Sequence, residues 1–287
     1  MGGRAGARRE ATIPGSVTFV DGELIHFIES GNGPAVVLIH GFPSNTFVWS
    51  EILPRLSEHH RAVALDLPGL GYSHRNSRRS FSLQSHAETV VGLMDQLGIE
   101  RATVVGLSMG GGVAERIAAT FPSRVNRLVL LAAIDESVGA HWENRRGDSI
   151  VLSVALRVPP LARIVARASL RATVEDPAFV TPALVEGYVR PLLRRGTFPC
   201  LKRYLFDNRD AARADLSRIT APTLVLSGER DKTVLAETGR TIASKITGAR
   251  YVVLERANHL IALERADDVF GEIVRFLRDG SDGPDDG

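Results

Sequence analysis

The chain has 287 residues, of which 44% are hydrophobic and 24% are charged, and its formal net charge at pH 7 is +2. This composition is ordinary for a globular protein with a sizeable buried core, and so small a net charge argues against a nucleic-acid partner. The single cysteine, Cys200, excludes an internal disulfide and a zinc site built on cysteine ligands.

The two ends of the chain are predicted to be solvated, flexible tails. Residues 1–14 contain several glycines and arginines but no apolar stretch typical of a secretory signal, and residues 279–287 are acidic and glycine-rich. No segment approaches the roughly 18 uncharged apolar residues of a membrane-spanning helix. We therefore expect a cytoplasmic protein without a membrane span, whose oligomeric state has no signature in the sequence.

Eight short apolar runs are predicted to be β-strands. The first two, 16–20 and 24–30, flank Asp21 and Gly22, a pair typical of a hairpin turn. Several of the later runs are apolar without interruption, as in strands that are covered on both faces of a sheet. These later strands are predicted at 35–40, 62–67, 103–107, 128–133, 223–229 and 251–255.

Helical patterns alternate with these strands. Residues 82–98 begin at a capping serine and end at a glycine, and the pattern at 111–122 stops at a proline. Residues 234–246 and 265–279 carry apolar side chains at helical spacing. Strands that alternate with helices predict an α/β protein with a mostly parallel sheet and helices on both of its faces.

One segment, residues 135–219, interrupts this alternation. It is too long for a structureless loop in a compact domain, and it contains helical patterns at 149–158 and 161–171. We expect a helical cap inserted between two parts of one core, 15–134 and 220–278. This cap is expected to form a lid over a site at the carboxyl edge of the sheet, where ligands bind in open parallel sheets.

Ser108 directly follows the predicted strand 103–107 and lies between Gly106 and Gly110 in a Gly-x-Ser-x-Gly pattern. A serine on a sharp turn from strand to helix needs small neighbours, because the backbone there is strained and crowded. The pattern by itself also occurs in ordinary turns. Between a buried strand and a helix it indicates a catalytic nucleophile.

An acid and a base follow two other predicted strands. Asp231 comes after strand 223–229, and His259 comes after strand 251–255. A serine nucleophile needs a base, which an imidazole supplies near neutral pH, and the imidazole needs a carboxylate to fix its tautomer. The order serine, aspartate, histidine after three separate strands therefore predicts a triad with Ser108.

The segment after strand 35–40 is predicted to complete an oxyanion hole. A tetrahedral intermediate needs two hydrogen-bond donors, and we expect these to be the backbone amides of Phe42 and Met109. Pro43 has no amide proton and cannot take this role. The side chains of Phe42, Met109, Leu260 and Trp49 are expected to contact the substrate.

Five blocks of the sequence resemble the conserved segments of the α/β-hydrolase superfamily. The resemblance covers roughly residues 15–134 and 220–278 and implies an eight-stranded, mostly parallel sheet. It also implies a triad of Ser108, Asp231 and His259 and catalysis without a metal or an organic cofactor. The matching blocks are HGFPSNTFVW (40–49), DLPGLGYS (66–73), GLSMGG (106–111), SGERD (227–231) and ANHL (257–260).

A rival for the acid lies after strand 128–133. Some members of the superfamily place the acid there, which makes Asp135, or its neighbour Glu136, the alternative to Asp231. The block SGERD matches the more usual arrangement. We therefore predict Asp231 as the acid and keep Asp135 as the alternative.

The same comparison separates several activities. Epoxide hydrolases and haloalkane dehalogenases share an HGFP-like segment but use an aspartate nucleophile, whereas Ser108 would form acyl-enzymes. Carbon–carbon bond hydrolases share the SMGG segment but typically carry a tryptophan after the catalytic histidine, where this chain has Leu260. Cofactor-free haloperoxidases, which behave as perhydrolases, are similar in both blocks.

The sequence thus predicts a serine hydrolase that cleaves a carboxylic ester or lactone of a small to medium hydrophobic substrate through an acyl-enzyme on Ser108. A perhydrolase or a carbon–carbon bond hydrolase is the alternative within the same chemistry. A non-hydrolytic member of the fold, such as a cyclase or a ligand receptor, is the alternative of a different class.

Overall fold

The computed structural model describes residues 15–135, 158–207 and 213–279 of the chain. Eight strands form one sheet in the order β1-β2-β4-β3-β5-β6-β7-β8. All the predicted strands are present, and the largest difference is that β6 begins at Val125 rather than at 128. The strands are β1 (Ser16–Val20), β2 (Glu23–Ser30), β3 (Ala35–Ile39), β4 (Arg61–Leu65), β5 (Ala102–Leu107), β6 (Val125–Leu131), β7 (Thr223–Gly228) and β8 (Arg250–Leu254).

The sheet is parallel except at β2, which pairs antiparallel with both β1 and β4. The β1–β2 hairpin turns at Asp21 and Gly22, whose φ angles are 49° and 78°. Two residues at positive φ produce a turn whose twist matches that of the flanking strands. The expected eight-stranded, mostly parallel sheet is therefore confirmed.

Helices cover both faces of the sheet. On one face α2, α3 and α8 bury their apolar sides, and on the other face α1, α9 and α10 do so. Helix α2 begins as predicted at a capping serine, because the Ser82 hydroxyl accepts a hydrogen bond from the Ser85 amide at 3.2 Å. The bounds are α1 (Leu53–Leu56), α2 (Leu83–Gln96), α3 (Met109–Thr120), α8 (Ala236–Lys245), α9 (Ile261–Glu264) and α10 (Ala266–Arg278).

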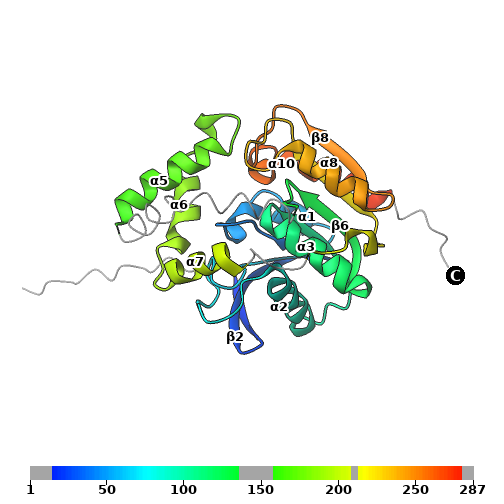
Figure 1. Cartoon of the computed structure of the whole chain (residues 1–287), viewed down its shortest axis with the longest axis horizontal. Helices are drawn as coiled ribbons and strands as arrows, with labels where there is room; N and C mark the ends of the chain where they lie inside the picture. The colour runs from blue at the N-terminus through cyan, green and yellow to red at the C-terminus, as the bar shows by residue number, and fades with distance from the viewer. Residues whose placement is uncertain (1–14, 136–157, 208–212, 280–287) are drawn as a thin grey trace, which may run out of the picture.

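Three further helices, α5 (Pro159–Ala172), α6 (Pro182–Leu192) and α7 (Thr197–Asp207), lie in the chain between β6 and β7. They group together beside the sheet, on the left of Figure 1. The helical pattern expected at 161–171 is α5, whereas the pattern at 149–158 lies almost wholly outside the described residues. Short 3-10 helices are η1 (Thr46–Trp49), η2 (Pro122–Arg124), η4 (Pro177–Phe179) and η5 (Leu216–Arg218).

The predicted tails, 1–14 and 279–287, fall outside the described residues apart from Asp279. Within the described ranges, no helix is both long and apolar enough to cross a lipid bilayer. In the same ranges, no three His, Cys, Asp or Glu side chains are grouped so as to hold a metal ion.

Candidate active site

Ser108 occupies the turn between β5 and α3 with a φ of 53°. A non-glycine residue at positive φ is uncommon and concentrates at functional sites, where the surrounding structure supports the strain. The crowding around this turn is severe, since a Cβ added to Gly106 would lie 2.2 Å from the Gly110 carbonyl oxygen. The Gly-x-Ser-x-Gly pattern is therefore required sterically by this turn.

The loops after β5, β7 and β8 bring three polar side chains together. Ser108 Oγ lies 3.0 Å from Nε2 of His259, and Nδ1 of the same ring lies 2.7 Å from Oδ2 of Asp231. An ionised carboxylate can only accept, so Nδ1 carries the proton and Nε2 is left to accept from the serine hydroxyl. This is the tautomer in which the imidazole can remove the proton of Ser108.

The carboxylate of Asp231 is held in place by its second oxygen. Oδ1 accepts hydrogen bonds from the backbone amides of Thr233 and Val234, at 2.7 and 2.9 Å. Oδ2 is thereby directed to the imidazole, and the side chain is buried. Both oxygens have defined partners, which keeps the orientation of His259 fixed.

The rival acid lies elsewhere. Asp135 forms an ion pair with Lys245 at 2.9 Å, and Glu136 is outside the described residues. The imidazole Nδ1 of His259 is bonded to Asp231. The structure thus brings the preferred acid, rather than Asp135, to the ring.

The loop after β3 lies against Ser108. A Cβ on Gly41 would come within 3.0 Å of the Ser108 Cβ, so only glycine fits there without displacement. The Leu67 amide donates to Nε2 of His40 at 3.0 Å, which leaves the proton on Nδ1 to donate to the Gly41 carbonyl at 2.7 Å. Burial lowers the pKa of His40 and favours this neutral form.

The orientation of the Gly41 carbonyl determines that of the next amide. The Gly41–Phe42 peptide is trans, so its C=O and N–H point in opposite directions. Because the carbonyl points to His40, the Phe42 amide is turned away from that ring. The Met109 amide is the first of helix α3 and directly follows the serine.

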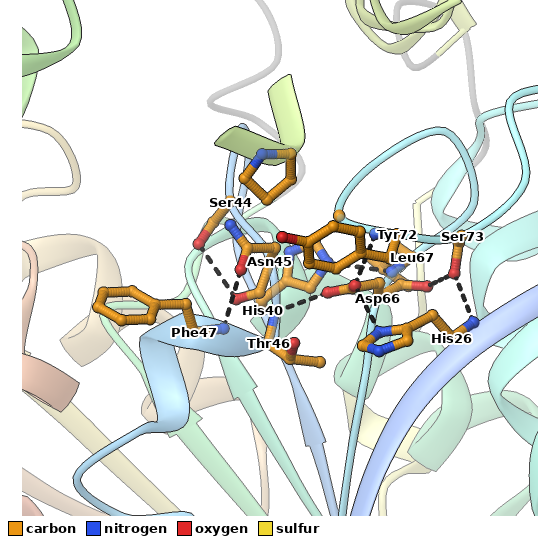
Figure 2. A network of polar contacts seen from close by, with 12 residues as sticks. His26, His40, Ser44, Asn45, Thr46, Phe47, Asp66, Leu67, Tyr72 and Ser73 are labelled. Atoms are coloured by element: carbon orange, nitrogen blue, oxygen red, sulfur yellow. Dashed lines mark hydrogen bonds and ion pairs between the residues drawn. The ribbon is translucent and has the colours of Figure 1, made fainter. Parts of the chain in front are cut away.

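A buried aspartate ties this loop to its neighbours (Figure 2). Asp66 accepts hydrogen bonds from the backbone amides of Thr46 and Tyr72, at 2.6 and 2.7 Å, and from Nδ1 of His26 at 2.7 Å. Burial by itself raises the pKa of this carboxyl, but the hydrogen bonds from His26 and from the Tyr72 amide help to bring it below its ordinary value. The carboxylate of Asp66 thus joins three segments, namely the loop after β3, the loop after β4 and strand β2.

Replacing Asp66 with Ala is expected to lower the free energy of unfolding by about 3–5 kcal/mol, because it leaves three buried donors without their acceptor. Since the pKa of Asp66 is lower in the folded state, its contribution is fully present above the unfolded value of about 3.9 and is lost as pH falls through the folded value. Urea denaturation at several pH values measures both effects. Asp267→Ala, which removes an exposed carboxylate, is the control; a loss below about 1 kcal/mol for Asp66→Ala contradicts the expectation.

A cavity opens beside Ser108 and His259, and its far wall is formed by α5 and α6. Helix α5 contributes Ala162, Ala166 and Ser169, which share one helix face. None of the described residues that line the cavity is Asp, Glu, Lys or Arg. The part of the wall that the structure describes is therefore mostly apolar, and its polar members are hydroxyl side chains and His259.

The expected substrate contacts are placed unequally. Phe42 and Leu260 line the cavity, whereas the Met109 side chain is buried in the core between sheet and helices. Trp49 is fully buried in the core and is not among the described residues that line the cavity, so the structure does not support a substrate contact for its side chain. An apolar residue near a motif does not reveal which face of the sheet it will join.

The cap expected from the sequence contains α5 and α6, but the residues of these helices that line the cavity were not among the predicted site residues. Ala162, Ala166 and Ser169 recur every three or four residues, and Tyr188 and Leu192 do the same on α6. This spacing was a usable signal for a helix face, but it does not say what the face covers. Burial raises the pKa of Tyr188, so its phenol stays neutral in this wall.

The sequence model of the alpha/beta hydrolase fold family matches residues 34–266. The 2-hydroxy-6-oxo-6-phenylhexa-2,4-dienoate hydrolase of Comamonas testosteroni is 30% identical over 266 residues, which are 89% of this chain and 91% of that protein. The solved enol-lactonase from Burkholderia xenovorans LB400 is 27% identical, with a TM-score of 0.75, and the match covers 92% of this chain and 100% of the enol-lactonase. A solved thermophilic esterase from Thermogutta terrifontis is 25% identical, with a TM-score of 0.76, and the match covers 93% of this chain and 98% of the esterase.

Proposed function

Since the chain belongs to the alpha/beta hydrolase fold family, we propose that it is a serine hydrolase that cleaves carboxylic esters or lactones of small to medium apolar substrates. The observation that carries this proposal is the position of His259, hydrogen-bonded to Ser108 on one side and to Asp231 on the other. This arrangement activates a serine for attack on an acyl carbon.

In the proposed reaction Ser108 Oγ attacks the substrate carbonyl carbon while Nε2 of His259 takes the hydroxyl proton. The Phe42 and Met109 amides stabilise the negative charge that develops on the carbonyl oxygen. The imidazolium, stabilised by Asp231, then protonates the leaving oxygen, and the acyl group remains on the serine. Water gives a proton to His259 and attacks the acyl carbon, which releases the acid and restores the serine hydroxyl.

The lining of the cavity favours an ester or lactone over a carbon–carbon substrate. The dienoate named for the Comamonas testosteroni relative carries a carboxylate, whose burial requires a cationic partner. The described residues that line the cavity include no Lys or Arg. A neutral acyl group fits this wall, so α5 and α6 are proposed to act as a lid that selects apolar substrates.

Carbon–carbon bond cleavage is the second candidate, because the dienoate hydrolase of Comamonas testosteroni is 30% identical over most of both chains. One substrate panel separates the two: p-nitrophenyl esters of rising chain length, a lactone, and the phenylhexadienoate. We expect ester or lactone turnover that Ser108→Ala abolishes, with the dienoate slower by at least about 100-fold. Faster turnover of the dienoate supports the second candidate, and a folded protein that turns over nothing and resists a fluorophosphonate probe contradicts the hydrolase proposal.

Enlarging Ala166 is expected to shorten the longest acyl chain that the enzyme accepts. Phe at this position fills space beside Ser108, and overpacking costs about 1–3 kcal/mol, equivalent to about 10- to 100-fold in kcat/KM for long esters. Acetate esters are expected to change little. The control is Ala168→Phe, an exposed position on the same helix that does not line the cavity; equal effects of the two variants contradict the assignment of this wall.

A further inference from the structure

The backbone of His259 is bonded directly to the end of helix α5. The carbonyl of Thr173, the residue that caps α5, accepts hydrogen bonds from the amides of His259 and Leu260, both at 3.0 Å. In the sequence Thr173 comes before strand β7, whereas His259 comes after strand β8. The loop that carries the imidazole is thus attached to the inserted helices as well as to the sheet.

Asn258 makes a second connection between the same two segments. Its Oδ1 accepts from the His259 amide at 2.9 Å, and its Nδ2 donates to the carbonyls of Val174 and Ala172 at 3.1 and 3.4 Å. The side chain is buried, so these groups have little access to water as an alternative partner. The position needs an acceptor and a donor on one short side chain, which asparagine provides.

Other side chains hold the end of α5 without touching His259. The carboxylate of Glu264 accepts from the amides of Glu175 and Asp176 at 2.8 and 2.7 Å, and Arg230 forms an ion pair with Glu175. The end of α5 is therefore anchored at several points. Among the described residues, only Thr173 and Asn258 form hydrogen bonds with the backbone amide of His259.

Helix α5 lines the substrate cavity along the same face that ends at Thr173. Thr173, whose carbonyl accepts from the His259 amide, is itself one of the residues that line this cavity. The distance of 3.0 Å from Nε2 to Ser108 Oγ must be kept for proton transfer, and a misplacement of about 1 Å can cost about 100-fold in rate.

We propose that Asn258 is a positioning residue that joins the peptide of His259 to the end of α5, so that the substrate-lining helix and the imidazole keep one fixed relation. The role of the imidazole rests on the proposed function. The link itself rests on the hydrogen bonds of Asn258. Both halves of its amide are needed, one toward His259 and one toward Ala172 and Val174.

Two variants of Asn258 separate the halves of this link. Asn258→Ala removes both. Asn258→Asp keeps an acceptor for the His259 amide but sets carboxylate oxygens against two carbonyls of the α5 segment. We expect both to lower kcat by about 10- to 100-fold while KM changes by less than about threefold. The control is Glu264→Gln, which loosens the same segment without contacting His259 and is expected to lower Tm but to leave kcat within about threefold.

A second readout does not depend on turnover. The Nδ1 proton of His259, hydrogen-bonded to Asp231, is expected to give a sharp downfield proton NMR signal in the wild type and in Glu264→Gln, and a broadened or missing signal in both Asn258 variants. If Asn258→Ala does not fold, Asn258→Asp, which is isosteric, decides the question.

Three results would overturn the proposal. The first is wild-type kcat and NMR signal in Asn258→Ala. The second is wild-type behaviour of Asn258→Asp beside an impaired Asn258→Ala, which would make the residue a local turn former without a link to α5. The third is an equal loss of kcat in Glu264→Gln. A failure of the proposed function is recognised separately, because Ser108→Ala would then keep the activity while the NMR test still reports on Asn258.

Discussion

Replacing Ser108 with Ala is expected to lower kcat toward the best ester by about 10⁴- to 10⁶-fold, since the variant has no nucleophile to form the acyl-enzyme. Its KM is expected to change little, because the apolar cavity that binds the substrate stays intact. Steady-state kinetics with a p-nitrophenyl ester measures both values. Covalent labelling by a fluorophosphonate probe, followed by mass spectrometry, is expected to locate the adduct on Ser108 and to vanish in the variant.

The members of the triad are expected to act as one unit. His259→Ala alone is expected to cost about as much as Ser108→Ala, and the double variant little more than either, because each single change already stops the same step. Ser169→Ala is the matched control, since this serine also lines the cavity but is not the serine bonded to His259. Retention of more than about a tenth of the wild-type kcat by Ser108→Ala, or a comparable loss in Ser169→Ala, contradicts the mechanism.

Asp231→Asn is expected to lower kcat by about 10⁴-fold while leaving the fold intact. The amides of Thr233 and Val234 retain the side-chain oxygen that they bind now, so the new NH₂ group must face Nδ1 of His259. Nδ1 then has to accept, the proton moves to Nε2, and the imidazole can no longer take the proton of Ser108. The loss arises from the wrong tautomer rather than from a missing contact.

The rival acid supplies the control for this prediction. Asp135→Asn changes the ion pair with Lys245 and is expected to leave kcat within about threefold of the wild type. The two variants are compared by kcat over a pH range and by thermal unfolding. A larger loss of kcat in Asp135→Asn than in Asp231→Asn would reverse the assignment of the acid.

The strand pattern and the turn at Ser108 were predictable because both are local. An apolar run covered on both faces is uninterrupted in the sequence, and β3, β5 and β7 follow from that pattern. The small residues around Ser108 follow from the steric demands of one tight turn. Neither inference needs to know which residues meet across the fold.

The placement of Trp49 shows where this reasoning stops. It lies close in the sequence to Phe42, and both are aromatic, yet Phe42 lines the cavity and Trp49 is fully buried in the core. The 3-10 helix η1 turns the chain between them. The direction of the chain after this turn depends on packing against β4 and α9, which no local pattern encodes.

The sequence by itself thus determined the alternating α/β core, the strained serine turn and the order of serine, aspartate and histidine, because short-range periodicity and sterics encode each of them. Only the tertiary structure shows which acid is bonded to the imidazole. It also shows that Asp66 joins two loops to β2 and that the His259 loop is bonded to the end of α5. Asn258 and Ala172 are 86 positions apart, and Thr46 and Asp66 are 20 apart. Such hydrogen bonds depend on how elements far apart in the sequence pack together, which no short-range pattern encodes.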